Sequence, residues 1–215
     1  MIELHHAPST AAMAPHILLT EIGVPFVLRP VDTAAQAHRS PAYLALNPNG
    51  RVPVLADGDL VLYESAAICL HLVDRHPQAG LAPPPGSDER AHFYKWLVWL
   101  TNTLQATLMV FFYPERWLTD GNDAGAAELK SCAEGRAGAL LDLLEAELQR
   151  HGGPWLLGVR YSAVDAYALM LCRWTRHFAH PARVRPALGA YLQRVLDRPA
   201  VRQVFEREGL ALPWV

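Results

Sequence analysis

Cysteine is scarce in this chain. The 215 residues include three cysteines, Cys69, Cys132 and Cys172, which lie far apart and form no Cys-x-x-Cys pair. An odd number at such spacing does not make a disulfide framework or a redox motif. The sequence therefore predicts no structural disulfides, and each cysteine is interpreted as a small buried apolar residue. A reducing cytoplasm is the expected location.

A large excess of charge of one sign is also missing. The formal net charge is −2, so neither nucleic acid nor an anionic membrane is expected as a partner. No apolar run approaches the length of a membrane span, and the first residues lack the basic and apolar segments of a secretion signal. Because 51% of the residues are hydrophobic, the composition predicts globular domains and excludes a disordered protein.

The chain divides into two parts with different patterns. Residues 1–78 alternate short apolar runs with helical segments, whereas residues 88–215 show helical periodicity almost throughout. The Gly- and Pro-rich stretch 79–87 between them is typical of a stiff linker. The predicted fold class is therefore an α/β domain at 1–78 followed by an all-helical domain at 88–215.

Turn and cap residues place the elements of both parts. In the first, the order strand, helix, strand, helix, hairpin, helix predicts two parallel strands joined by a right-handed crossover, with an antiparallel hairpin beside them. The expected strands are at 2–6 and 26–31, the hairpin turn is at Asp57-Gly58, and the last helix covers about 64–75. In the second part, helices are expected at about 88–112, 123–150, 163–176, 186–196 and 199–208. Ser162 and Asp165 have the spacing of a capping box.

The most informative segment is Asn-Pro-Asn-Gly-Arg-Val-Pro-Val-Leu at 47–55. It predicts a turn followed by a strand that is entered through the Val52-Pro53 bond. A cis proline there would leave the main chain of Val52 able to pair with an extended peptide. The alternative is an ordinary trans proline at a strand start, since only about 5–6% of such bonds in folded proteins are cis.

Glu64 and Ser65 follow at the start of a helix. The first N–H groups of a helix are unpaired and carry partial positive charge, so they attract a carboxylate. Glu64 could accept a hydrogen bond from an ammonium group beside that carboxylate. The alternative is a plain helix start with Ser65 as its cap. A ligand that is part peptide and part acid, with an ammonium group, has the chemistry of glutathione.

Together these segments resemble the glutathione S-transferase family. The resemblance covers essentially the whole chain and is carried by four motifs in family order: residues 47–55, Glu-Ser-Ala-Ala-Ile at 64–68, the Pro-rich linker, and the Ser-x-x-Asp box at 162–165. It implies a thioredoxin-like N-terminal domain joined to an all-helical domain, and usually a homodimer.

The resemblance also implies how glutathione is bound. The main chain of Val52, next to Pro53, would pair with the peptide, and Glu64 and Ser65 would hold its γ-glutamyl end. Arg51 is a less certain contact.

The first helix departs from the family pattern. The segment at 7–16 is most similar to the bacterial beta class, whose cysteine falls on Ala11 here. The hydroxyls of Ser9, and then of Thr10, are therefore the candidates for activating the thiol of glutathione. Each could instead be a helix cap, and main-chain amides could carry the stabilisation. The beta-class histidine falls near Gln105, so no imidazole partner is expected there.

A cluster of aromatic residues ends the first long helix. Phe112, Tyr113 and Arg116, with Met13, are candidates for a hydrophobic co-substrate pocket, and core aromatics at a helix stop are the alternative. No metal site is expected, because His5, His6 and His16 do not show ligand spacing.

The expected protein is a cytoplasmic, homodimeric glutathione transferase. It would conjugate glutathione to a small hydrophobic electrophile or reduce a peroxide, with no cofactor beyond glutathione. Two alternatives stay open on the same scaffold: a non-catalytic glutathione-binding or ligand-binding protein, and a glutathione-dependent disulfide reductase.

Overall fold

The computed structural model describes all 215 residues, which form two compact units. The first contains Met1–Pro83 together with Val195–Trp214, and the second contains Pro84–Arg194 with Val215. The helical pattern of residues 195–214 predicts that they belong to the helical domain. The structure groups them with the N-terminal segment.

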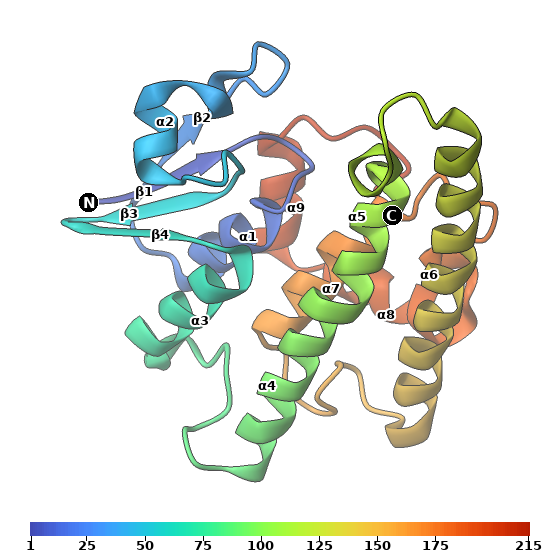
Figure 1. Cartoon of the computed structure of the whole chain (residues 1–215). Helices are drawn as coiled ribbons and strands as arrows, with labels where there is room; N and C mark the ends of the chain where they lie inside the picture. The colour runs from blue at the N-terminus through green and yellow to red at the C-terminus, as the bar shows by residue number, and fades with distance from the viewer. The chain divides into compact units, whose positions relative to one another are not determined.

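A four-stranded mixed sheet forms the centre of the first unit (Figure 1). Its strands are β1 (Ile2–His6), β2 (Phe26–Pro30), β3 (Val54–Asp57) and β4 (Leu60–Tyr63), in the order β2-β1-β3-β4. β1 and β2 are parallel, and β3 is antiparallel to both β1 and β4. The predicted crossover and hairpin, and with them the thioredoxin-like fold of this part, are confirmed.

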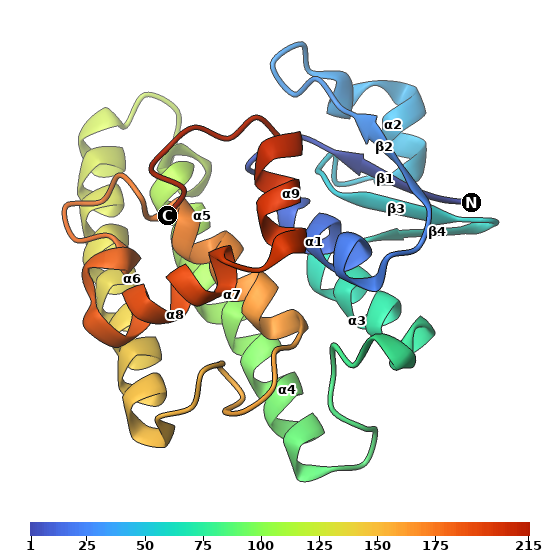
Figure 2. The same cartoon turned by 180° about the vertical axis from the view of Figure 1, so that it is seen from behind.

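Helices cover both faces of this sheet (Figures 1 and 2). α1 (Met13–Ile22) and α3 (Ser65–Arg75) lie on one face, and α2 (Pro41–Leu46) lies on the other. The short helical turns are η1 (Ala37–Arg39) and η2 (Pro77–Ala79). α9 (Pro199–Arg207) packs along α1.

Local signals explain where the first helices begin and end. Gly23 closes α1 in the left-handed conformation and donates its N–H to the carbonyl of Leu19. Ser40 caps α2, because its hydroxyl accepts the N–H of Tyr43 at 3.3 Å, and Pro41 occupies the first turn.

The second unit is helical. Its elements are α4 (Asp88–Trp99), η3 (Leu100–Gln105), α5 (Ala106–Phe112), η4 (Pro114–Trp117), α6 (Asp123–His151), α7 (Ala163–Trp174), η5 (Ala182–Val184) and most of α8 (Pro186–Leu196). α5 and α6 pack side by side (Figure 1). The helix predicted at 88–112 is continuous, but its middle part, η3, is π-helical. Such a widened turn has no simple sequence signature.

α7 is the buried helix of this unit, because every residue from Ala163 to Arg173 is buried. The predicted capping box opens it. Asp165 accepts the N–H of Ser162 at 2.7 Å, the N–H of Leu156 at 2.8 Å and the hydroxyl of Tyr191 at 2.9 Å. Burial raises the pKa of Asp165 to about 6, although these hydrogen bonds act in the opposite direction.

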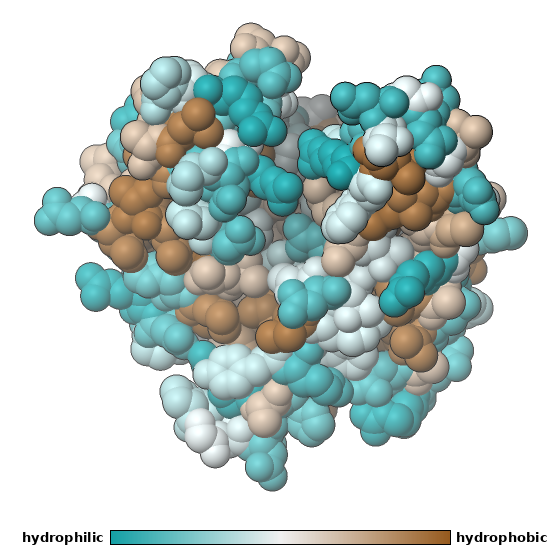
Figure 3. Space-filling view, in the orientation of Figure 1, coloured by the Kyte–Doolittle hydropathy of each residue, from teal (hydrophilic) through white to brown (hydrophobic).

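Some apolar and reactive side chains reach the surface. Figure 3 shows hydrophobic residues in separate places among hydrophilic ones, and the exposed apolar side chains include Leu60 and Val61 on β4. Cys69 and Cys172 are buried as expected, but Cys132 on α6 is exposed, so the interpretation as a buried residue is wrong for it. None of the helices has both the length and the apolar character that a membrane span needs.

Replacing Asp165 by Ala should lower the free energy of unfolding by at least about 3 kcal/mol, because several buried donors would lose their acceptor. Urea denaturation followed by circular dichroism measures this change. The matched control is Asp123→Ala, which removes an exposed carboxylate from the first turn of α6 and should cost less than about 1 kcal/mol. Equal losses in the two variants would contradict the role given to the capping box.

Candidate functional site

The sheet register brings three candidate segments to one end of the first unit. His5 is opposite Val54, and Val54 is opposite Tyr63. The chain leaving β1, the chain entering β3 and the chain leaving β4 therefore lie at the same end of neighbouring strands. These segments contain Ser9 and Thr10, then Val52, and then Glu64 and Ser65.

The Val52-Pro53 bond is cis, as the functional interpretation of the sequence required. Neither the N–H nor the carbonyl of Val52 forms a hydrogen bond in the structure. Pro53 is buried, whereas Val52 is partly exposed. An extended ligand could therefore pair with the main chain at Val52.

The residues before Val52 are held by a polar turn. The carbonyl of Arg51 accepts the hydroxyl of Tyr43 at 3.0 Å and the side-chain amide of Asn47 at 2.7 Å. Gly50 has φ of 55°, and a Cβ at this position would lie 3.0 Å from the carbonyl oxygen of His38. The Arg51 residue itself is exposed. This turn fixes the main chain that enters β3.

Glu64 has an unusual backbone conformation, with φ of 72° and ψ of 112°. Its side chain is exposed, and its carbonyl accepts the N–H of Ile68 as the first hydrogen bond of α3. The N–H groups of Ser65, Ala66 and Ala67 have no partner, as is usual in a first turn. The start of α3 therefore offers free donors next to an exposed carboxylate.

The hydroxyl of Ser65 does not cap its own helix. It donates a hydrogen bond of 2.8 Å to the carbonyl of Ala11, and the residue is buried. Ser65 therefore ties the start of α3 to the turn before α1. No sequence signal revealed this contact, which spans 54 positions.

The turn before α1 contains both candidate hydroxyl residues. Thr10 donates its hydroxyl to the carbonyl of Ala7 at 2.6 Å and accepts the N–H of Ala12 at 3.3 Å. Its hydroxyl is thus engaged in the local turn, whereas the residue that caps α1 is Ala12, which makes no side-chain hydrogen bond. Ser9 has φ of 60°, and its N–H donates to a carboxylate oxygen of Glu208 at 2.8 Å. The N–H of Ala11 forms no hydrogen bond.

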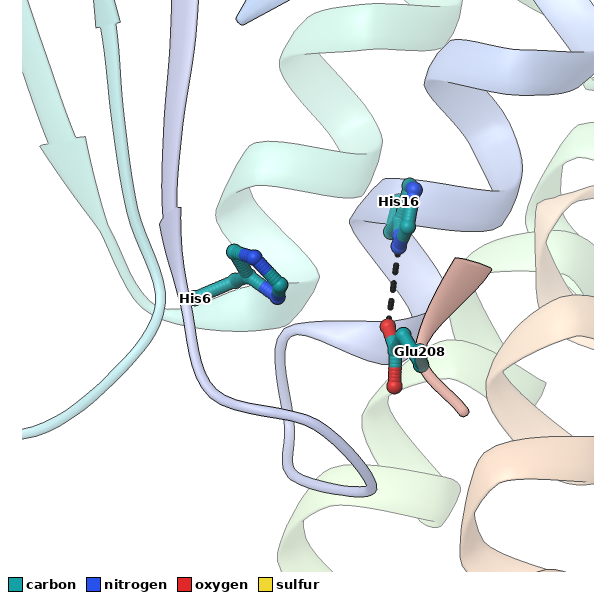
Figure 4. Close-up of side chains that lie close together, drawn as sticks. All are labelled: His6, His16 and Glu208. Atoms are coloured by element: carbon teal, nitrogen blue, oxygen red, sulfur yellow. Dashed lines mark hydrogen bonds and ion pairs between the residues drawn. The ribbon is translucent and has the colours of Figure 1, made fainter. Parts of the chain in front are cut away.

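Glu208 belongs to a buried cluster that sequence reasoning missed (Figure 4). Its second carboxylate oxygen lies 2.8 Å from Nδ1 of His16, which is 192 positions earlier in the sequence. The ring of His6 lies 5.8 Å from the ring of His16, and all three residues are buried. The cluster could not be found from spacing, because its carboxylate comes from the end of α9.

The candidates for the hydrophobic pocket are placed as follows. Phe112 ends α5 and Tyr113 follows it, and these side chains are 42% and 38% exposed. The guanidinium of Arg116 lies over the ring of Tyr113 at 3.7 Å from its centre. Met13, at the start of α1, is fully buried.

The turn at residues 7–12 contains no cysteine, and Ala11 stands where the resemblance to the beta class would place one. Burial raises the pKa of Cys172 to about 12 and raises that of Cys69 as well. Near Gln105, the side-chain oxygen of this glutamine accepts the hydroxyl of Tyr167 at 2.6 Å. The chain's own buried thiols are therefore not suited to nucleophilic chemistry.

Two family models match the chain. Residues 1–74 match the glutathione S-transferase N-terminal domain, and residues 100–199 match the glutathione S-transferase C-terminal domain. Among curated proteins, the chain is 31% identical to glutathione S-transferase GST-4.5 of Xanthomonas campestris pv. campestris, with 97% of this chain and 100% of the relative covered.

Solved structures agree with this result. A glutathione transferase homologue from Sulfitobacter with bound glutathione is 26% identical, with a TM-score of 0.88 and coverage of 98% and 99% of the two chains. The bacterial beta-class glutathione S-transferase of Sphingomonas chungbukensis is 30% identical, with a TM-score of 0.82 and coverage of 97% and 100%. The family models, the relatives and the fold thus show that this chain belongs to the glutathione S-transferase family.

Proposed function

We propose that this protein is a glutathione transferase that binds glutathione at the common end of β1, β3 and β4. It lowers the pKa of the bound thiol and presents the thiolate to a hydrophobic electrophile or a peroxide. The observation that carries the proposal is the convergence of unpaired main-chain groups, at Val52 and at the first turn of α3, beside the exposed carboxylate of Glu64.

The γ-glutamyl end of glutathione needs partners for one carboxylate and one ammonium group. The free N–H groups at the start of α3 provide hydrogen bonds and a positive helix end for the carboxylate. Glu64 provides a negative charge for the ammonium group. The cysteinyl part would exchange hydrogen bonds with the N–H and carbonyl of Val52, and Arg51 is proposed to contact a second ligand carboxylate.

Activation of the thiol is assigned to the turn before α1. A free thiol has a pKa of about 8.5, and hydrogen-bond donors at a helix start lower it. We assign the main part to Ser9 and to the free N–H of Ala11. Thr10 is the weaker candidate, because its hydroxyl hydrogen is already donated to Ala7.

The reaction then follows from the chemistry of the thiolate. With an electrophile, the sulfur forms a bond to carbon and displaces a leaving group or adds to a polarised double bond. With a hydroperoxide, one glutathione takes up an oxygen atom and releases the alcohol, and a second glutathione yields the disulfide and water. Phe112, Tyr113 and Arg116 are proposed as contacts of the co-substrate. Met13 was grouped with them from the sequence, but its side chain is fully buried.

A homodimer, a cytoplasmic location and a role in detoxification are further parts of the proposal. The family resemblance supports the homodimer, and the lack of a disulfide pattern supports the cytoplasmic location. Light scattering coupled to size-exclusion chromatography measures the oligomeric state, and a monomer at micromolar concentration would remove the dimer from the proposal.

Replacing Glu64 by Gln should weaken glutathione binding by about 10-fold to 100-fold, because a charge-assisted hydrogen bond is lost. Isothermal titration calorimetry measures the dissociation constant. The matched control is Asp59→Asn, which removes an exposed carboxylate at the other end of the same hairpin and should leave binding unchanged. Unchanged affinity in Glu64→Gln would remove this residue from the site.

Replacing Ser9 by Gly should raise the pKa of the bound thiol by about 1–2 units, because a hydrogen bond to a charged group contributes about 1.5–3 kcal/mol. Glycine is the appropriate substitution because it accepts the positive φ of this position without strain. The ultraviolet absorbance of the thiolate, followed against pH, measures the shift.

The comparison variant is Thr10→Val, which removes the hydroxyl and keeps the branched shape. It should lower stability by about 1 kcal/mol through loss of the bonds to Ala7 and Ala12, and should leave the thiol pKa in place. A raised pKa of the bound thiol in Thr10→Val, with no change in Ser9→Gly, would transfer the activating role to Thr10.

A non-catalytic glutathione-binding protein is the second candidate function, favoured by Ala11 at the position of the beta-class cysteine and by the engaged hydroxyl of Thr10. Glutathione affinity without turnover of aryl halides, hydroperoxides or mixed disulfides would support it. Turnover confined to mixed disulfides would instead identify a reductase.

A further inference from the structure

Three elements of the first unit bring potential metal ligands to one buried place (Figure 4). His6 ends β1, His16 lies within α1, and Glu208 follows α9. One ligand atom from each of the three side chains lies within 4.8 Å of the other two. The exposed fractions are 6%, 0% and 7%, so the cluster is closed from bulk solvent.

Both histidines have a ring nitrogen without a partner. Nδ1 of His6 and Nε2 of His16 are buried and form no hydrogen bond. Buried polar atoms are usually paired, so the unpaired Nδ1 of His6 needs a physical explanation such as a bound ion. The unpaired Nε2 of His16 points away from Glu208, because Nδ1 is the ring atom at the carboxylate.

We propose that His6, His16 and Glu208 form a binding site for a divalent transition metal of the zinc class. Two imidazoles and one carboxylate are a common protein ligand set for such ions, whereas Mg²⁺ and Ca²⁺ prefer oxygen ligands alone. Three protein ligands leave a fourth position for water. The expectation from sequence spacing did not include this site, because Glu208 is distant in the chain.

The geometry needs only a small adjustment. Zinc ligands at about 2.1 Å in a tetrahedral arrangement lie roughly 3.4 Å from one another, so the widest separation must close by about 1.4 Å. His16 and Glu208, now 2.8 Å apart, must open by about 0.6 Å to admit the ion, and His6 makes the larger movement. The other oxygen of Glu208 stays hydrogen-bonded to the N–H of Ser9, which orients the carboxylate from outside the ligand set.

Binding requires a bare nitrogen at each imidazole ligand. The hydrogen between Nδ1 of His16 and the carboxylate of Glu208 moves to Nε2 of the same ring, and the metal takes its place between the two atoms. No electron transfer is involved. The site differs from the proposed glutathione site, and its test contains no glutathione.

The experiment uses the full chain without a histidine tag, after removal of metals with a chelator. Titration with Zn²⁺ by calorimetry should give one equivalent. Titration with Co²⁺ should give the visible absorption bands of a tetrahedral site without the near-ultraviolet bands of thiolate ligands. The absence of thiolate bands distinguishes binding at this site from binding at the exposed thiol of Cys132.

His6→Asn should weaken Zn²⁺ binding by at least about 100-fold, because a direct ligand is lost and loss of an outer partner alone costs 10–100-fold. The matched control is His5→Asn on the same strand, since neighbouring residues of a strand point to opposite faces. The control should bind as the unchanged protein does. Circular dichroism verifies that both variants are folded.

Glu208→Gln is the second variant, because glutamine keeps an acceptor for the N–H of Ser9 but lacks the anionic ligand. It should also lose the cobalt bands. Absence of Zn²⁺ binding, or equal binding in His6→Asn and His5→Asn, would overturn the proposal and leave the cluster as a hydrogen-bonded clamp on Ser9.

Discussion

The hydrogen bond from the hydroxyl of Ser65 to the carbonyl of Ala11 holds the candidate site together. It joins the first turn of α3 to the turn before α1, two places where main-chain N–H groups are free. Loss of the buried Ser65 hydroxyl would leave the carbonyl of Ala11 without this partner. Together with the pairing of β1, β3 and β4, this contact sets the separation between the groups that would hold the γ-glutamyl end and those that would meet the sulfur.

The backbone at the site is held in conformations that most residues avoid. Ser9 and Glu64 are two of the three residues other than glycine with positive φ, the third being Gln36. Each such conformation costs about 1–3 kcal/mol and persists only where neighbouring contacts over-determine it. At Ser9 that contact is the hydrogen bond from its N–H to Glu208, and at Glu64 it is the pairing of β4 immediately before it. Stability is thus given up where ligand contacts are expected, which is the usual pattern of a functional site.

Local signals in the sequence predicted most of the fold. The cap at Ser40, the stop at Gly23, the hairpin at Asp57-Gly58 and the box at 162–165 depend on neighbouring residues, and the structure confirms them. Long-range partners could not be predicted in this way. The contact of Ser65 with Ala11 and the contacts of Glu208 link positions 54 to 199 residues apart, and no spacing rule reports such pairs. The engaged hydroxyl of Thr10 and the π-helical turn η3 likewise depend on geometry that residue types alone do not specify.

The first unit is assembled from both ends of the chain, with a consequence for recombination between homologues. Residues 195–214 belong with residues 1–83, and Arg198 forms a two-fold ion pair with Glu21 of α1 at 2.5 and 2.8 Å. In a chimera joined at the Pro-rich stretch 79–87, α1 would come from one parent and α9, which packs along it, from the other. Exchange of a whole folding module between relatives must therefore use two crossover points, one between residues 83 and 84 and one between residues 194 and 195.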